Sequence, residues 1–192
     1  MNKINKSDYL GNNSEPQKNN PNEKMVCDAA EQGVLGCMIL EPELNVANCI
    51  EKLKSNENIF YNSKHKIIYK TILELYNANE LIDCVTLVDK LNRSNLLEAA
   101  GGVAYVTSLP DATPSAANLD YYIKIIKEKF LLRKIYNALN NCVAEVTNPK
   151  GDVNELVDSI ESKILQLNEE NIKEVVTPSK EMVRETMAKI EY

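Results

Sequence analysis

His65 is the first residue to test for chemistry, because histidine is the side chain most often used as a general base near neutral pH. It lies between Lys64 and Lys66, and the surrounding sequence holds no cysteine partner and no acidic cluster. A Ser-His-Asp or Cys-His arrangement would need partners that the local sequence does not offer. We therefore expect His65 to lie on the surface of a helix and to have no catalytic role.

Motifs for nucleotides and metals are also missing from the sequence. The double glycine at 101–102 is followed by Val-Ala-Tyr without a phosphate-binding lysine, and neither GxxxxGK[ST] nor HExxH spacing occurs. The cysteines are odd in number and form no CxxC pair; they are Cys27, Cys37, Cys49, Cys84 and Cys142. We expect a reducing compartment, no metal site, no cofactor and no enzymatic activity in this chain.

Composition predicts an all-α globular protein. The 192 residues include 22 basic and 28 acidic side chains, and the net charge of −6 disfavours a nucleic-acid surface. An apolar content of 44% allows a buried core, and only 6 glycines and 7 prolines favour long helices. No signal peptide and no apolar run of about 18 residues is present, so we expect a cytoplasmic protein without a membrane span.

The chain is predicted to begin with a disordered, asparagine-rich tail over residues 1–24, followed by a helical head over residues 25–113. Six short helices are expected in this head. The first begins near Cys27 and stops at Glu41-Pro42, and the next two run from Glu43 to Lys54 and from Asn62 to Asn77. The fourth follows an N-cap at Asp83, the fifth lies around Leu96-Leu97, and the sixth runs from Val103 to Leu109. Gly101-Gly102 is expected to form a turn between the last two.

Residues 114–170 are predicted to form a long antiparallel helical hairpin. One helix runs from Asn118 to Val146, about 43 Å at 1.5 Å per residue. A breaker cluster over residues 147–152 separates it from a second helix, which Asp152 caps and which ends near Asn168. The two helices carry more apolar surface than a lone hairpin can cover, which marks an interface.

A linker and a docking helix are expected over residues 171–192. The helix carries a narrow apolar stripe, and we expect this stripe to dock outside the chain; it consists of Met182, Val183, Met187 and Ile190.

Several segments, in the correct order, resemble one protein family. They are AEQGVLG (30–36), NIFY (58–61), HKIIY (65–69), GGVAYV (101–106), PSAAN (114–118) and KFLLR (129–133). Over residues 25–170 the chain resembles the amino-terminal domain of DnaB-type bacterial replicative DNA helicases. Departures are Cys37, where the family usually has an apolar residue, and the asparagine-rich tail.

This resemblance implies a collar that serves oligomerisation within the primosome. Subunits of the family pair through their hairpins, and three such pairs form a collar above a ring of ATPase motors. The collar recruits the C-terminal domain of a DnaG-type primase, and a helicase loader is a further partner. ATP, magnesium and the main DNA contacts belong to the motor domain, which we expect to be absent from this chain. We expect the hairpin contact at Ile126, Phe130, Arg133, Tyr136, Leu156, Ile160 and Ile164.

Two other functions stay open at this point. One is a free-standing regulator or inhibitor of helicase assembly that never carries a motor. The other is a single-strand binding module, which only the nine tyrosines favour. The tyrosines at 61, 69, 76, 105 and 122 fall within apolar periodic runs, so core packing explains them better.

Overall fold

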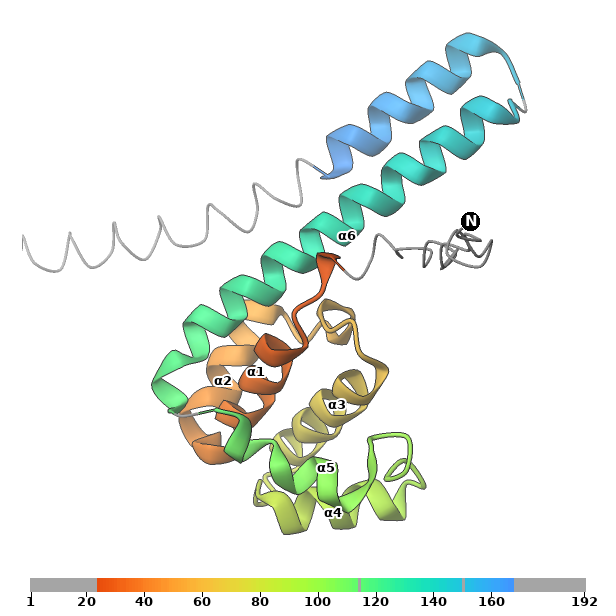
Figure 1. Ribbon diagram of the computed structural model, residues 1–192. Helices are drawn as coiled ribbons and strands as arrows, with labels where there is room; N and C mark the ends of the chain where they lie inside the picture. The colour runs from red at the N-terminus through yellow and green to blue at the C-terminus, as the bar shows by residue number, and fades with distance from the viewer. Residues whose placement is uncertain (1–23, 114, 150, 168–192) are drawn as a thin grey trace, which may run out of the picture.

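The structure is a computed structural model that describes residues 24–113, 115–149 and 151–167. Every regular element in this part of the chain is a helix, as the sequence predicts. A rounded head holds the shorter helices, and a two-helix hairpin projects from it (Figure 1). Residues 1–23 of the predicted tail (1–24) and the predicted docking stripe over residues 182–190 lie outside the described residues.

Helix α1 (Asp28–Leu40) lies at the centre of the head and contacts α2 (Pro42–Leu53), α3 (Ser63–Asn77) and α6 (Leu119–Thr147) (Figure 1). Most of its side chains are buried, which explains why its apolar residues do not form a single stripe. A β-carbon at Gly36 would lie 2.5 Å from the carbonyl oxygen of Leu109. The glycine therefore lets the 3₁₀ segment η3 (Pro110–Ala112) approach the helix closely.

Polar caps fix where the next helices begin. The side chain of Asn62 accepts a hydrogen bond from the Lys64 backbone N–H at 3.1 Å, which starts α3. Asp83 caps α4 (Cys84–Arg93) by accepting the Thr86 N–H at 2.8 Å, and the Thr86 hydroxyl accepts the Asp83 N–H in return. The predicted N-cap at Asp83 is confirmed.

The segment between α4 and α5 (Gly102–Ser108) does not form the short helix that the sequence predicts there, so the head differs from the expected six short helices. Leu96 and Leu97 form no helix, because α4 ends at Arg93, with Ser94 as its C-cap, and Asn95 takes a left-handed φ of 56°. Gly101 and Gly102 have φ values of +101° and +78°, so the predicted turn at this pair is confirmed. Two further 3₁₀ turns, η2 (Glu57–Ile59) and η4 (Ala116–Asn118), complete the connections.

Helix α6 belongs to both the head and the hairpin. Its bounds agree within a residue with the predicted helix from Asn118 to Val146. Leu119, Ile123 and Ile126 in its first turns are buried in the head core, so packing does not divide the chain at residue 114. The second arm, which we call the return helix, occupies residues 153–167 and lies antiparallel to the distal half of α6 (Figure 1).

Within the described residues, we find no helix with both the length and the apolar character needed to cross a bilayer.

Candidate assembly interface

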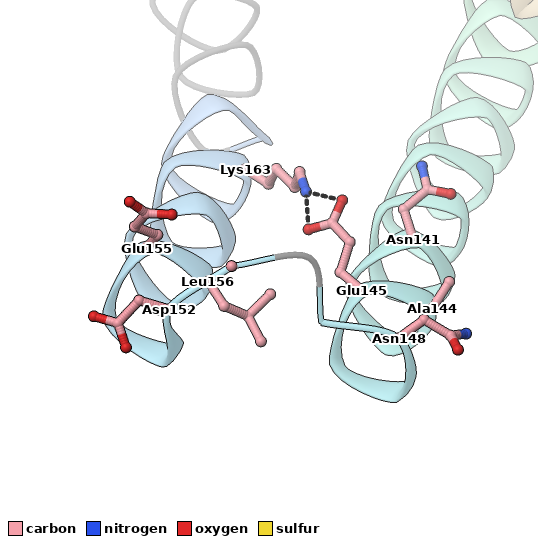
Figure 2. A pocket seen from close by; sticks show the side chains of 9 residues that line it. Asn141, Ala144, Glu145, Asn148, Asp152, Glu155, Leu156 and Lys163 are labelled. Carbon is pink, nitrogen blue, oxygen red and sulfur yellow. Dashed lines mark hydrogen bonds and ion pairs between the residues drawn. The ribbon is translucent and has the colours of Figure 1, made fainter.

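The hairpin is closed by polar contacts near its tip. Lys163 of the return helix forms an ion pair with Glu145 of α6, and Figure 2 shows the two side chains pointing toward each other. Glu145 also accepts a hydrogen bond from the Ser159 hydroxyl at 3.5 Å. Leu156 points into the space between the two arms, where a pocket of about 570 Å³ opens (Figure 2).

A row of apolar side chains on the hairpin is exposed in the single chain. Its members are between 45% and 67% exposed; they are Leu132, Leu139, Val143, Val146, Val153, Val157, Ile164 and Leu165. We call this set the hairpin apolar row. On α6 the spacing of Leu139, Val143 and Val146 places them on one face, and on the return helix Val153, Val157 and Ile164 share a face in the same way. Exposed apolar side chains that gather on one face of a helix mark a candidate contact surface.

The structure places the seven predicted interface residues in different environments. Ile126 is 1% exposed within the head core and Arg133 is 8% exposed, so the expectation that these two face a partner subunit is corrected. Phe130 is half-buried and packs against the head core. Tyr136, Leu156 and Ile160 are half-buried on the hairpin, and Ile164 belongs to the hairpin apolar row.

Arg133 fixes the hairpin to the head. Its guanidinium donates to the carbonyl oxygens of Met25 at 2.9 Å and Ile59 at 2.7 Å, and it lies over the rings of Tyr61 and Phe130. Burial lowers the pKa of this guanidinium, although the Glu31 carboxylate partly offsets that effect. The contacts join α6 to the start of the described chain and to the turn before α3.

A buried polar network, which the sequence analysis missed, lies beside this junction. Glu31 of α1 accepts the backbone N–H of Tyr61 at 2.6 Å and that of Asn62 at 3.2 Å. Oε2 of Glu31 also lies 2.6 Å from Nδ1 of His65, and Nε2 of His65 lies 2.5 Å from the Tyr105 hydroxyl. Every buried polar atom of this network therefore has a partner.

The expected surface position of His65 is wrong, because its side chain is fully buried. A signal for this was available in the sequence. His65 precedes Ile68, Tyr69 and Ile72 at spacings of three, four and seven residues, which puts it on the apolar face of α3. Its neighbours Lys64 and Lys66 lie on other faces of α3, so their charge does not indicate that His65 is exposed.

One group of side chains has the residue types of a metal site. Ligand atoms of Asp28, Glu31 and His65 lie within 4.8 Å of one another. The Glu31 oxygens already accept backbone N–H groups and contact His65, and Asp28 accepts hydrogen bonds from Gln32 and Asn62. We assign the group to the polar network that joins α1, α3 and α5.

Comparisons with known proteins decide the family. Residues 24–128, which are more than half of the chain, match the family described as DnaB-like helicase N terminal domain. The chain belongs to this family. The match covers the head and the first turns of α6, including Glu31, His65 and Tyr105.

Curated relatives in the family are described as replicative DNA helicases. The DnaB helicase of Rhodothermus marinus is 34% identical over 161 residues, which are 84% of this chain and 17% of that protein. The DnaB helicase of Mycobacterium leprae is 37% identical over 161 residues, which are 83% of this chain and 26% of that protein. The chain thus spans about a sixth to a quarter of the length of these two relatives.

Solved structures in the family share the fold. The crystal structure of the N-terminal domain of DnaB helicase from Mycobacterium tuberculosis matches with a TM-score of 0.67 and 37% identity, covering 73% of this chain and 96% of that one. A structure described as a DnaB-like replicative helicase and its interactions with primase matches with a TM-score of 0.59. At 22% identity the second likeness shows the fold alone; it covers 73% of this chain and 31% of that one.

Proposed function

We propose that this chain is the collar of a bacterial replicative DNA helicase, in which it pairs with a second copy through the hairpin and recruits a primase. The observation that carries this proposal is the hairpin apolar row, because eight exposed apolar side chains on two adjacent helices need a cover. A second hairpin presents the same row, so an isologous pair covers both at once.

Membership in the DnaB-like family supports the rest of the assembly. Its relatives are described as replicative helicases, which favours a helicase collar over a free-standing regulator. We infer that three pairs form the collar of a hexamer that unwinds DNA with ATP and magnesium in motor domains, in the bacterial cytoplasm. One structural neighbour is described with primase, which supports a DnaG-type primase C-terminal domain as partner; a helicase loader is a further candidate.

The structure suggests which residues would make the contact between copies. We propose the hairpin apolar row as its centre, flanked by the half-buried Phe130, Tyr136, Leu156 and Ile160. Burial of apolar surface contributes about 25 cal/mol per Å², and this contribution is insensitive to salt. We also propose that Met182, Val183, Met187 and Ile190, outside the described residues, dock on another subunit or on a further domain.

Light scattering over a concentration series tests the pairing. The chain has a mass of 21.6 kDa, so a pair has 2 × 21.6 = 43.2 kDa. We expect a pair or a multiple of it for the wild type, and a monomer of unchanged helicity for Leu139→Asp, whose side chain is 52% exposed.

Leu81→Asp is the matched control, because Leu81 is 68% exposed but lies on the head. It should leave the mass unchanged. A wild-type chain that is monomeric at every concentration would contradict pairing through the hairpin.

A further inference from the structure

A groove runs across the head where the start of α2 lies beside the end of α3. It has a volume of about 610 Å³, and it is lined by the first turn of α2, by the last turn of α3 and by the connection from α3 to α4. Helix α4 lies at the end of the head opposite the hairpin (Figure 1). Among the described residues that line the groove, none belongs to the hairpin apolar row. We call it the head groove, and pairing through the hairpin does not use it.

One wall of the head groove is apolar. Tyr76 packs against the head core, and Leu81, which also lines the groove, is 68% exposed. Leu40 and Leu44 lie two residues before and after Pro42, another lining residue, and they are 45% and 68% exposed. An exposed leucine in the wall of a groove, with two more close by in the chain, marks a surface that another apolar group can cover.

Two carboxylates line the head groove, and both can attract a cation. Glu43 is exposed in the first turn of α2, and within the described part of the chain its carboxylate forms no ion pair. Glu80 forms an ion pair with Lys90 at 3.7 Å, and the two side chains are 53% and 30% exposed. Exposed pairs of this kind contribute little to stability, so the Glu80 carboxylate can accept a second cation.

The C-terminal end of α3 adds negative potential to the groove. Its last turn contains Tyr76 and no basic residue. The final carbonyl groups of a helix carry about half a negative elementary charge, which favours a cation beside them. The chain turns back at this point, because Asn79 has a left-handed φ of 54° and the Glu80 N–H donates to the Leu75 carbonyl oxygen at 3.0 Å. Glu80 is thereby held at the same end of α3, where one lysine or arginine can meet both.

We propose that the head groove receives a lysine or arginine, flanked by apolar residues, from the primase domain that the collar recruits. The inference rests on the proposed function, because the primase is the partner proposed there. The volume of about 610 Å³ lies within the ~300–1,000 Å³ of common binding pockets and has room for several side chains of one segment.

Two other occupants fit the head groove less well. A nucleic acid is disfavoured because Glu43 and Glu80 repel phosphate groups. A second copy that docked face to face through the same groove would bring these two carboxylates of both chains together, and like charges in an interface oppose association.

The C-terminal domain of the cognate primase, labelled for fluorescence anisotropy, is the probe. Glu43→Lys should raise the Kd at least about tenfold, since it sets a like charge against the incoming cation. Leu81→Asp should have an effect of similar size, because it places a charge on the apolar wall. Glu43→Gln, which removes only the charge, should give a smaller rise. Thermal melting followed by circular dichroism verifies that each variant is folded.

Each substitution has a matched control. Glu51→Lys reverses an exposed charge on the same helix as Glu43, and Val103→Asp places a charge on another exposed apolar residue of the head; neither residue lines the groove. Both should change the Kd by less than about twofold. On the primase domain, one Lys→Glu or Arg→Glu substitution should restore binding to Glu43→Lys but not to Leu81→Asp.

Failure of the inference is distinguishable from failure of the proposed function. A Kd for Glu43→Lys and Leu81→Asp equal to those of their controls would overturn the inference and leave the proposed function standing. A wild-type chain that does not bind the primase domain would overturn both the inference and the recruitment of a primase. Pairing through the hairpin is judged separately, by the mass of Leu139→Asp.

Two further results would assign the head groove to another occupant and so overturn the inference. A lower mass of Glu43→Lys or Leu81→Asp in light scattering would make a second copy the occupant. A labelled peptide of residues 179–192 that binds the wild type and not Leu81→Asp would make the C-terminal stripe of this chain the occupant.

Discussion

Nδ1 of His65 lies 2.6 Å from Oε2 of Glu31, and neither side chain is more than 1% exposed. The contact joins α3 to α1, the central helix of the head. Because Glu31 also accepts two backbone N–H groups from the turn before α3, a single carboxylate sets the position of that turn. Arg133 donates to the carbonyl oxygen of Ile59 in the same region, so the hairpin is fixed to a turn that Glu31 holds.

Replacing Glu31 by alanine should destabilise the head strongly. The change leaves two backbone N–H groups and one histidine nitrogen without their acceptor in a buried place. We expect the free energy of unfolding in urea to fall by about 3–5 kcal/mol. Glu51→Ala, at an exposed position of α2, is the control and should change it by less than about 0.5 kcal/mol. Equal effects of the two substitutions would contradict the role given to Glu31.

Removal of the hydroxyl group should affect the free energy of unfolding differently at Tyr69 and at Tyr105. Among the described residues, the Tyr69 hydroxyl is the buried side-chain polar atom that lacks a hydrogen-bond partner, whereas the Tyr105 hydroxyl lies 2.5 Å from His65. Tyr69→Phe should therefore leave the free energy of unfolding unchanged or raise it by up to about 1 kcal/mol. Tyr105→Phe should lower it by about 1–2 kcal/mol. A loss of stability in Tyr69→Phe larger than that in Tyr105→Phe would show that these assignments are wrong.

The cap of α4 should make stability depend on acid pH. The backbone N–H of Thr86 stabilises the ionised Asp83 carboxylate, which holds its pKa below the ordinary value in the folded chain. Because the pKa of Asp83 is lower in the folded chain than in the unfolded chain, its ionised carboxylate stabilises the fold. This stabilisation is complete above the pKa of about 4 in the unfolded chain, and it is lost as the pH falls through the pKa in the folded chain.

Asp83→Ala should accordingly cost about 1 kcal/mol at pH 7. The difference from the wild type should shrink below about pH 4. Urea unfolding of both proteins over a pH series measures this difference. A constant difference across the series would mean that the charge of Asp83 does not contribute.

Gly36→Ala should disturb the contact between α1 and η3. The added β-carbon would lie 2.5 Å from the carbonyl oxygen of Leu109, a backbone atom that cannot rotate away. We expect a loss of about 1–3 kcal/mol in the free energy of unfolding, despite the better helix propensity of alanine. Gly102→Ala is a useful comparison, because a β-carbon there meets no atom within 4 Å and only its φ of +78° opposes the change. Were Gly36→Ala to stabilise the chain, the close approach would be wrong.

Local signals in the sequence are sufficient to predict most of the helices. Asn62 and Asp83 start α3 and α4 through hydrogen bonds to residues only two or three positions away, and the breaker cluster at 147–152 ends α6. Contacts between residues far apart in the sequence have no such local signal. His65 pairs with a carboxylate 34 residues earlier, and Arg133 with a carbonyl 74 residues earlier. His65 was therefore expected on the surface and Arg133 at the contact with a partner subunit, because no local pattern names the distant residue with which each interacts.

The same limit applies to the interface. Apolar periodicity on the hairpin predicted a surface in excess of what two helices can cover, and the hairpin apolar row is that surface. The periodicity did not show how far the head covers α6. Ile126 and Phe130 were therefore predicted at the contact in place of Leu139, although the first is buried in the head and the second packs against its core.

The central claim, pairing through the hairpin apolar row, is tested most directly by sedimentation velocity of the wild-type chain and of Leu139→Asp combined with Val143→Asp. Both side chains are more than half exposed, so the substitutions should spare the fold. We predict that the wild type sediments as a pair or a larger even assembly in both low salt and 1 M NaCl, and that the double variant sediments as a monomer. A wild type and a double variant with identical sedimentation coefficients at every concentration would contradict the claim.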